Sequence, residues 1–246
     1  MSRILLFAIS FITLASCQSK NRKIQEVVQK AVAQSDFNGL LYIEQNGEVL
    51  FNGSIRFTES ELTMPNEDTP IYLASLSKVF TEGAALQLHD NGLINLSSSI
   101  SDQGVNEHQQ FGSLITPHHL LEMRSGLPRE FSYGEEFAQV IYDELDRAGP
   151  FLDTLPDFEL SFTPRSDEEY SNLNYWILGS MIEEVTDANP DRAFYDLIFD
   201  RLSMRSSGLV KSDTDVLHGY IFEDGLGRKM ILIIRAVMLQ VVFIRV

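Results

Sequence analysis

The stretch Tyr72-Leu73-Ala74-Ser75-Leu76-Ser77-Lys78 contains the only Ser-x-x-Lys motif in the chain. Residues 75–90 are expected to form a helix, and the spacing of three places Lys78 beside the Ser75 hydroxyl on one helical face. A serine attacks well only when a neighbouring base takes its proton, and lysine is such a base when its neutral form is favoured. Because both residues are common, the motif alone fits equally a helix cap followed by a solvated lysine.

A second polar motif lies 95 residues after Ser75, where Tyr170-Ser171-Asn172 is the only Tyr-x-Asn in the chain. The motif stands just before an apolar segment that is expected to form a helix. A tyrosine hydroxyl can relay a proton to a leaving group, and a carboxamide can hold a substrate amide while fixing the lysine. The two motifs together therefore indicate a hydrolytic site more strongly than either does alone.

Three ordered blocks of this sequence resemble the serine β-lactamase-like hydrolases, in which Ser-x-x-Lys is a signature. The blocks are residues 72–78, Leu120-Leu121-Glu122-Met123-Arg124-Ser125-Gly126-Leu127-Pro128, and residues 170–179. The nearest members are the class C β-lactamases, the D-alanyl-D-alanine carboxypeptidases and the penicillin-binding-protein-like esterases. The resemblance runs from roughly residue 24 to residue 228.

The resemblance implies an α+β fold in which an antiparallel sheet is flanked by helices. An all-helical insertion, roughly residues 76–200, would stand beside the sheet, with the active site between them. By the same resemblance Ser75 is the acylated nucleophile, Lys78 its base and Tyr170 the proton shuttle, while Asn172 contacts the substrate amide and the lysine. It implies a reaction through an acyl-enzyme on a peptide amide, β-lactam or ester. The substrate would be a small molecule or a peptidoglycan-type peptide, and no cofactor is implied.

The sequence departs from the family pattern after the second motif. No Lys- or His-Ser- or Thr-Gly triplet follows Asn172, although this third motif closes the carboxylate pocket and its strand supplies an oxyanion N–H group in the family. The C-terminal strands of the sheet are expected to be incomplete, and Arg165 stands where relatives usually have glycine. The alternative is therefore a truncated, non-catalytic remnant of such an enzyme that binds ligand or does nothing. A cell-surface binding module is a third interpretation, without positive support beyond the anchor described next.

The N-terminal residues Met1–Ser16 have the pattern of an export signal, with one Arg3 before an apolar run. Leu14-Ala15-Ser16-Cys17 resembles the lipobox of bacterial lipoproteins, in which the cysteine is lipidated. An ordinary signal peptide with a chance cysteine is the alternative. We expect an exported lipoprotein of the cell envelope, held at the membrane through Cys17 only, with the hydrolase-like domain over residues 17–230.

The C-terminal residues 231–246 read ILIIRAVMLQVVFIRV and contain no Asp, Glu, Gly, Pro, Ser, Thr or Asn. This composition breaks abruptly with the acidic chain that precedes it. Two interpretations stay open: a buried pair of strands without a turn residue, and a shift of the reading frame near Met230.

The composition of the chain limits its partners. Of the 246 residues, 44% are apolar and 22% charged, which is typical of a globular protein. Acidic residues outnumber basic ones 35 to 19, giving a formal net charge of −16, and nucleic-acid binding would need a basic stripe. The single cysteine excludes a disulfide framework, a thiolate zinc site and an iron–sulfur cluster within one chain.

The adjacent pair His118-His119 is too small a set for a zinc site, and neighbouring histidines on a helix point apart. We therefore expect a capping or surface role and no metal. Asp167-Glu168-Glu169 is expected to be a solvated turn rather than a calcium site. Trp176, which follows the second motif at helical spacing, is expected in the core.

Local signals predict the remaining elements. Asn46-Gly47 separates two β-rich runs and predicts a hairpin. Thr116-Pro117 predicts the start of a helix, and Asn91-Gly92 the end of another. Further helices are expected over residues 23–34, 175–185 and 193–202, the first with one apolar face.

Overall fold

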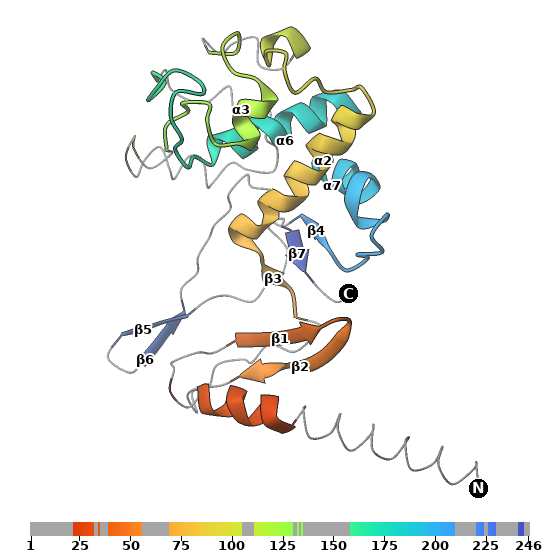
Figure 1. Ribbon diagram of the computed structural model, residues 1–246, viewed down its shortest axis with the longest axis vertical. Helices are drawn as coiled ribbons and strands as arrows, with labels where there is room; N and C mark the ends of the chain where they lie inside the picture. The colour runs from red at the N-terminus through yellow and green to blue at the C-terminus, as the bar shows by residue number, and fades with distance from the viewer. Residues whose placement is uncertain are drawn as a thin grey trace, which may run out of the picture. The chain divides into compact units, whose positions relative to one another are not determined.

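The computed structural model divides into two compact units, Met1–Thr69 and Pro70–Val246 (Figure 1). The residues that it describes are 22–31, 34, 39–55, 69–104, 111–129, 132, 134, 158–209, 220–223, 226–229 and 241–243. The expected export signal and Cys17 lie outside this set, as does most of the apolar tail.

The first unit contains a helix over residues 22–31 and the predicted hairpin. Strands β1 (Gly39–Gln45) and β2 (Glu48–Ile55) pair antiparallel, with a register shift after Ile43. Asn46 and Gly47 connect them at φ values of +55° and +78°. Both central residues of a type I′ turn need positive φ, which Asn and Gly adopt at least cost, so the hairpin prediction is confirmed.

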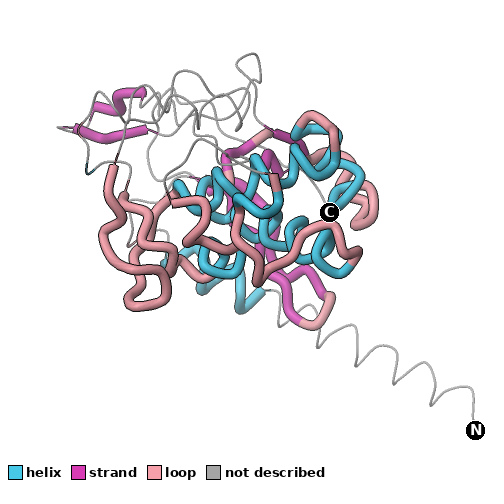
Figure 2. The backbone as a smooth tube through the Cα atoms, turned by 90° about the horizontal axis from the view of Figure 1, so that it is seen from above, coloured by secondary structure: helices cyan, strands magenta, loops and turns pink. Residues whose placement is uncertain are grey.

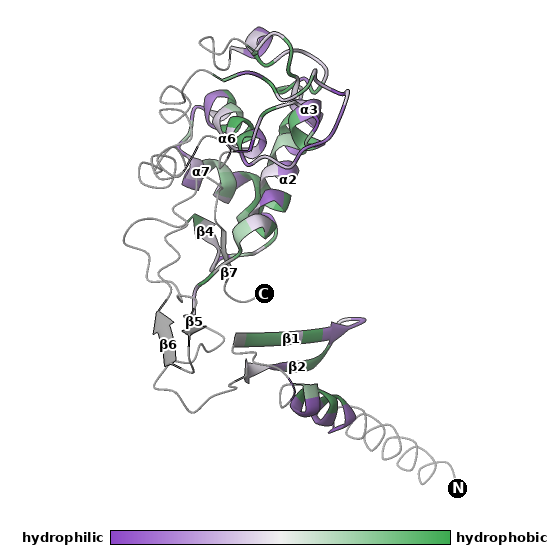
Figure 3. Ribbon diagram, turned by 90° about the vertical axis from the view of Figure 1, so that its left-hand side faces the viewer, coloured by the Kyte–Doolittle hydropathy of each residue, from purple (hydrophilic) through white to green (hydrophobic). Residues whose placement is uncertain are grey.

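The helix over residues 22–31 has a narrower apolar face than its spacing predicts. Val28 is buried, whereas Val27 is 67% exposed. Figure 3 shows purple and green stretches alternating on this helix, whereas β1 is green along most of its length. Val27, which the spacing places on the same face as Val28, is therefore largely uncovered, because apolar spacing does not determine how much of a helix its neighbours cover.

The second unit is built around α6 (Leu173–Thr186), which is buried over ten consecutive residues from Leu173 to Ile182. Helices α2 (Lys78–Asp90), α3 (Pro117–Leu121) and α7 (Pro190–Phe194) all contact α6. These helices gather in one group in both views (Figures 1 and 2). A helix that is buried all round is expected to be largely apolar on every face, and in this stretch of α6 only Asn174 and Ser180 are polar.

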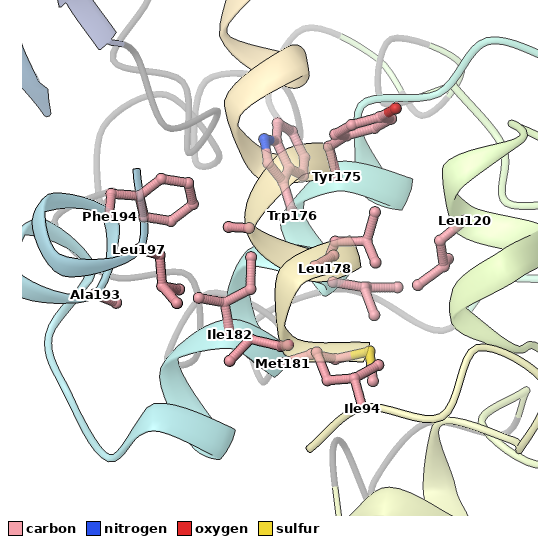
Figure 4. Packing of buried hydrophobic residues seen from close by; sticks show 14 of the residues in the cluster. Ile94, Leu120, Tyr175, Trp176, Leu178, Met181, Ile182, Ala193, Phe194 and Leu197 are labelled. Carbon is pink, nitrogen blue, oxygen red and sulfur yellow. The ribbon is translucent and has the colours of Figure 1, made fainter. Parts of the chain in front are cut away.

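Trp176 is fully buried in the cluster that these helices enclose, as the sequence predicts (Figure 4). A single π-helical turn, η4 (Tyr195–Phe199), continues α7 and contacts α2. The helix expected over residues 193–202 is therefore a short α-helix followed by a different turn geometry. A 3₁₀ turn, η2 (Ser101–Gln103), lies in the connection between α2 and α3.

The strands of the second unit form small antiparallel ladders. β3 (Ile71–Tyr72), β7 (Val241–Phe243) and β4 (Gly208–Leu209) make a three-stranded sheet in the order β3-β7-β4. β5 (Tyr220–Glu223) pairs with β6 (Leu226–Lys229). Helices together with antiparallel strands agree with the expected α+β class. The central strand β7 comes from the apolar tail, and β3 leads directly into the Ser-x-x-Lys motif.

Candidate active site

Ser75 lies at the junction between a strand and a helix. β3 ends at Tyr72, a 3₁₀ turn η1 spans Ala74–Ser77, and α2 begins at Lys78. The helix predicted to begin at Ser75 therefore starts with a tighter turn. Ala74 has a φ of +48°, a left-handed conformation that costs a residue with a Cβ about 1–2 kcal/mol. Such strained residues cluster at active sites, and here the strain directly precedes the exposed Ser75.

The Tyr170 hydroxyl joins the two motifs. It accepts a hydrogen bond from Lys78 Nζ at 2.8 Å and shares another with Ser75 Oγ at 2.8 Å. Lys78 Nζ also donates to Asn172 Oδ1 at 2.8 Å. All four residues proposed from the two motifs therefore meet in one cluster. Lys78 is only 9% exposed, whereas Tyr170 is 43% exposed, so the cluster opens to solvent on the serine and tyrosine side.

A buried polar network that the sequence analysis missed holds the Tyr-x-Asn segment in place. Asn174 is fully buried; its Oδ1 accepts from Ser125 Oγ at 2.5 Å, and its Nδ2 donates to the Ser171 carbonyl at 2.9 Å. Ser171 Oγ in turn donates to the Pro128 carbonyl at 2.7 Å. Buried polar groups of this kind cost free energy unless they are satisfied, so the network specifies one arrangement. It explains why the block at residues 120–128 accompanies the two motifs.

Gly126 in that block has no room for a side chain. Its φ is +81°, and a Cβ there would stand 2.1 Å from the Phe162 carbonyl oxygen. The Gly126 carbonyl accepts from Ser161 N at 2.8 Å, which joins this block to the loop before Tyr170. Only glycine fits a position that combines positive φ with such a close backbone approach.

The backbone at Arg165 has a conformation that glycine adopts most easily, which fits the glycine that the family resemblance implies at this position. Its φ is +74°. Two hydrogen bonds hold this backbone, from Arg165 N to the Arg124 carbonyl at 2.8 Å and from Arg124 Nη2 to the Arg165 carbonyl at 2.7 Å. The chain therefore keeps the left-handed turn without the glycine that adopts it most easily.

Tyr175 is a second aromatic residue beside the lysine, which the sequence analysis assigned only to an apolar helix. Lys78 Nζ lies 5.4 Å from the centre of its ring and 4.9 Å from that of Tyr170. Burial, followed by the charge of Glu82, raises the pKa of Tyr175 to about 12, so the phenol stays neutral over the physiological range. Helical periodicity identifies such a residue as buried but not as a neighbour of the lysine.

The two histidines of α3 have the capping and surface roles expected from the sequence. Thr116 N donates to His119 Nδ1 at 3.2 Å and His119 N to Thr116 Oγ1 at 3.3 Å, a reciprocal capping box. His118 Nε2 lies 3.3 Å from Glu122 Oε1 on the exposed side. Burial, followed by the charge of Arg165, lowers the pKa of His119.

Among the residues that the structure describes, no group of three metal-ligating side chains comes together. Asp167 and Glu168 are exposed in the loop before Tyr170, as expected for a solvated turn. Within the same ranges no helix has the length and apolar character to cross a membrane.

Comparisons with known proteins identify the family and the fold of the chain. The profile of the family "Beta-lactamase" matches residues 24–218. Protein flp of Staphylococcus aureus (strain N315) is 26% identical over 170 residues, which are 67% of this chain and 33% of that protein. The chain thus spans about a third of the length of this curated relative.

Two solved structures share the fold. A penicillin binding protein from Bacillus halodurans matches with a TM-score of 0.71 and 23% identity, over 87% of this chain and 68% of its own. The D-amino acid amidase from Ochrobactrum anthropi SV3 matches with a TM-score of 0.72 and 20% identity, over 92% of this chain and 66% of its own. At these identities the likeness concerns the fold alone.

Proposed function

Because this chain belongs to the beta-lactamase family, we propose that it is a serine hydrolase that cleaves an amide, β-lactam or ester through an acyl-enzyme. The observation that carries the proposal is the Tyr170 hydroxyl, which is hydrogen-bonded to both Ser75 Oγ and Lys78 Nζ at 2.8 Å. This geometry suits the removal of the serine proton, and a serine is a weak nucleophile until a base removes it.

In the acylation step, Ser75 Oγ attacks the substrate carbonyl carbon while its proton passes to the Tyr170 oxygen, whose own proton passes to the neutral Lys78 amine. The tetrahedral intermediate then collapses: the bond to the leaving nitrogen or oxygen breaks, and the leaving group takes a proton back through Tyr170. A water molecule then attacks the carbonyl carbon of the resulting ester while its proton passes through Tyr170 to Lys78. The bond between that carbon and Ser75 Oγ breaks, the serine takes the proton back through Tyr170, and the acid product leaves. Asn172, held by Lys78, offers its amide to the substrate amide.

The proposed substrate class follows from the family and from the exposed side of the cluster. The solved relatives include a penicillin binding protein and a D-amino acid amidase. We therefore favour a small molecule or a peptidoglycan-type peptide with an amide or lactam carbonyl. Ser75 and Tyr170 are both exposed and leave that carbonyl a path to the nucleophile.

Residues 173–246 contain no third motif, and this observation favours a second candidate, a non-catalytic relative that binds ligand at the same cluster. No Lys- or His-Ser- or Thr-Gly triplet follows Asn172 in the sequence. Loss of one oxyanion donor typically costs about 10²- to 10³-fold in turnover. An enzyme that lacks this donor would still acylate, but slowly, so the rate of acylation decides between the two candidates.

A covalent probe separates these candidates. The purified chain would be treated with a fluorescent penicillin and, in parallel, with a fluorophosphonate, because esterase-like members can ignore penicillin. Ser75→Ala removes the proposed nucleophile, and Ser206→Ala, at an exposed serine outside the cluster, is the matched control. We expect labelling of the wild type and of Ser206→Ala but not of Ser75→Ala.

Loss of labelling is informative only when the variant is still folded. Emission from Trp176, the single tryptophan and fully buried, reports whether each sample is folded. A folded chain that takes up neither probe supports the binding candidate. Labelling that survives in Ser75→Ala contradicts the proposed nucleophile.

We also propose that the protein is exported and held at the cell envelope by a lipid on Cys17, which rests on the lipobox-like Leu14-Ala15-Ser16-Cys17. Two or more acyl chains on one protein hold it stably at a membrane without a membrane-spanning helix. Cells fed an alkyne-tagged fatty acid would incorporate the tag into the wild type but not into Cys17→Ser. Equal incorporation into both would contradict the proposal.

A further inference from the structure

Lys78 Nζ lies between two aromatic rings that have different exposures. The ring centres of Tyr170 and Tyr175 are 4.9 Å and 5.4 Å from it, both within the range in which a ring attracts a cation. Tyr170 is 43% exposed and its hydroxyl belongs to the relay, whereas Tyr175 is only 7% exposed. Water therefore screens the interaction of the amine with the buried Tyr175 ring less than its interaction with the exposed Tyr170 ring.

The backbone fixes Tyr175 relative to the groups that surround the lysine. Tyr175 N donates to the Asn172 carbonyl at 3.0 Å, and Asn172 Oδ1 accepts from Lys78 Nζ. The Tyr175 hydroxyl makes a long contact of 3.5 Å with the Leu121 carbonyl of α3. The part of Tyr175 that lies near Lys78 Nζ is its ring. Figure 4 shows Tyr175 on α6 where this helix passes α2.

Among the residues that the structure describes, three titratable groups lie near Lys78 or Tyr175. Tyr170 and Tyr175 belong to the segment at and after the Tyr-x-Asn motif, and Glu82 lies one turn further along α2. Glu82 is exposed, and its charge reaches the Tyr175 hydroxyl. Because Tyr175 remains neutral, its effect on the amine comes from the ring quadrupole rather than from a charge.

We propose that Tyr175 is a positioning residue whose ring stabilises the ammonium form of Lys78 and so sets the pH at which this lysine can act as a base. Burial of Lys78 disfavours a charged amine, and the face of a nearby ring offsets part of that cost. The amine can then exchange its proton near working pH, as a general base must. The effect of the ring on catalysis rests on the proposed role of Lys78 as the base, whereas its effect on the titration of Lys78 does not.

The experiment measures the titration of Lys78 directly. The purified chain would be labelled with trace acetic anhydride across a pH series, and the peptide that carries Lys78 quantified by mass spectrometry, because only the neutral amine reacts. Tyr175→Leu removes the ring but keeps an apolar side chain, and Tyr175→Phe keeps the ring and removes the hydroxyl. We expect Tyr175→Leu to move the Lys78 midpoint down by about 0.5–1.5 pH units and Tyr175→Phe to leave it nearly unchanged.

A second series keeps the test valid if Tyr175→Leu fails to fold. Phenylalanine with an increasing number of ring fluorines at position 175 weakens the quadrupole at nearly constant shape, so the midpoint should fall step by step. Glu82→Gln separates the carboxylate charge from the ring and should leave that progression intact. A midpoint that does not respond to fluorination overturns the proposal, as does an equal shift in Tyr175→Phe and Tyr175→Leu.

Acylation kinetics give a separate readout. If Lys78 is the base, the acid limb of the labelling rate at Ser75 should move with the midpoint from variant to variant. A midpoint that moves while Ser75 remains unlabelled would refute the hydrolase function and leave the role of the ring intact. A midpoint that stays in place while Ser75 is labelled would refute the role of the ring alone.

Discussion

At the residue scale, the Tyr170 hydroxyl has two hydrogen-bond partners that the proposed chemistry needs, Ser75 and Lys78. Tyr170→Phe removes the oxygen and keeps the ring. We expect acylation at Ser75 to slow by about 10²- to 10⁴-fold, the usual contribution of a positioned acid or base. The rate of probe incorporation measures this effect.

The matched control for this substitution is Tyr195→Phe. Tyr195 is exposed to a similar degree as Tyr170, and its hydroxyl contacts Asp200. Neither Tyr195 nor Asp200 belongs to the two motifs. Its loss should leave the labelling rate unchanged. If Tyr170→Phe is labelled as fast as Tyr195→Phe, the proton does not pass through Tyr170.

Arg165 provides a prediction about stability at the same scale. Its φ of +74° disfavours any residue with a Cβ, and its two hydrogen bonds with Arg124 both use the backbone of Arg165. We expect Arg165→Gly to unfold with a free energy about 0.5–1 kcal/mol higher than Arg165→Ala, because relief of the left-handed strain exceeds the extra entropy of glycine. Both variants remove the same charge, so urea titrations monitored by Trp176 emission compare the backbone alone. A higher stability of Arg165→Ala would contradict this account.

The residues of the site differ in how well the sequence predicts them. Ser75, Lys78, Tyr170 and Asn172 belong to short motifs whose side-chain chemistry is informative without a structure. Asn174 and Tyr175 lie just after the Tyr-x-Asn motif in an apolar run. There the pattern indicates that a side chain is buried but not which atoms it contacts. Their contacts with Ser125 and Lys78 depend on how α6 packs against other segments.

At the element scale, local chemistry explains what could be predicted. The Asn46-Gly47 turn and the cap at Thr116 each depend on a few adjacent residues, and both form as expected. The pairing of β3 with β7 joins residues far apart in the sequence, and no local rule specifies such a partner. The 3₁₀ turn η1 and the π-helical turn η4 were missed for a related reason, since packing and not propensity selects these geometries.

The cap of α3 leads to a pH-dependent prediction. His119 accepts from Thr116 N through Nδ1, and burial followed by the Arg165 charge lowers its pKa. Below about pH 6.5 the unfolded chain therefore binds a proton that the folded chain resists, so stability falls as the pH drops from there through the folded pKa. His119→Gln keeps a capping-box acceptor that does not titrate. Between about pH 7.5 and 5.5 we expect the wild type to lose more unfolding free energy than this variant, measured by urea titration. Parallel losses in the two proteins would show that the cap does not titrate in this range.

At the scale of the whole molecule, the excess of acidic residues lowers the stability of the folded chain. The formal net charge is −16 at pH 7, and like charges repel more strongly in a compact state than in an extended one. The network of Ser125, Ser171 and Asn174 must therefore hold its segments together against a general repulsion.

This repulsion predicts a dependence of stability on salt. Raising the ionic strength from about 0.02 to about 0.2 M shortens the screening length from roughly 20 Å to below 10 Å, which weakens repulsion between surface carboxylates. We expect the midpoint of thermal unfolding at pH 7, followed by Trp176 emission, to rise by a few degrees. The same titration near pH 4.6, the sequence pI, is the internal control, because the net charge there is close to zero and the effect should vanish. A rise of equal size at both pH values would assign the stabilisation to salt effects on apolar burial instead. A fall at pH 7 would mean that attractive ion pairs such as Arg192–Asp196 outweigh the net repulsion.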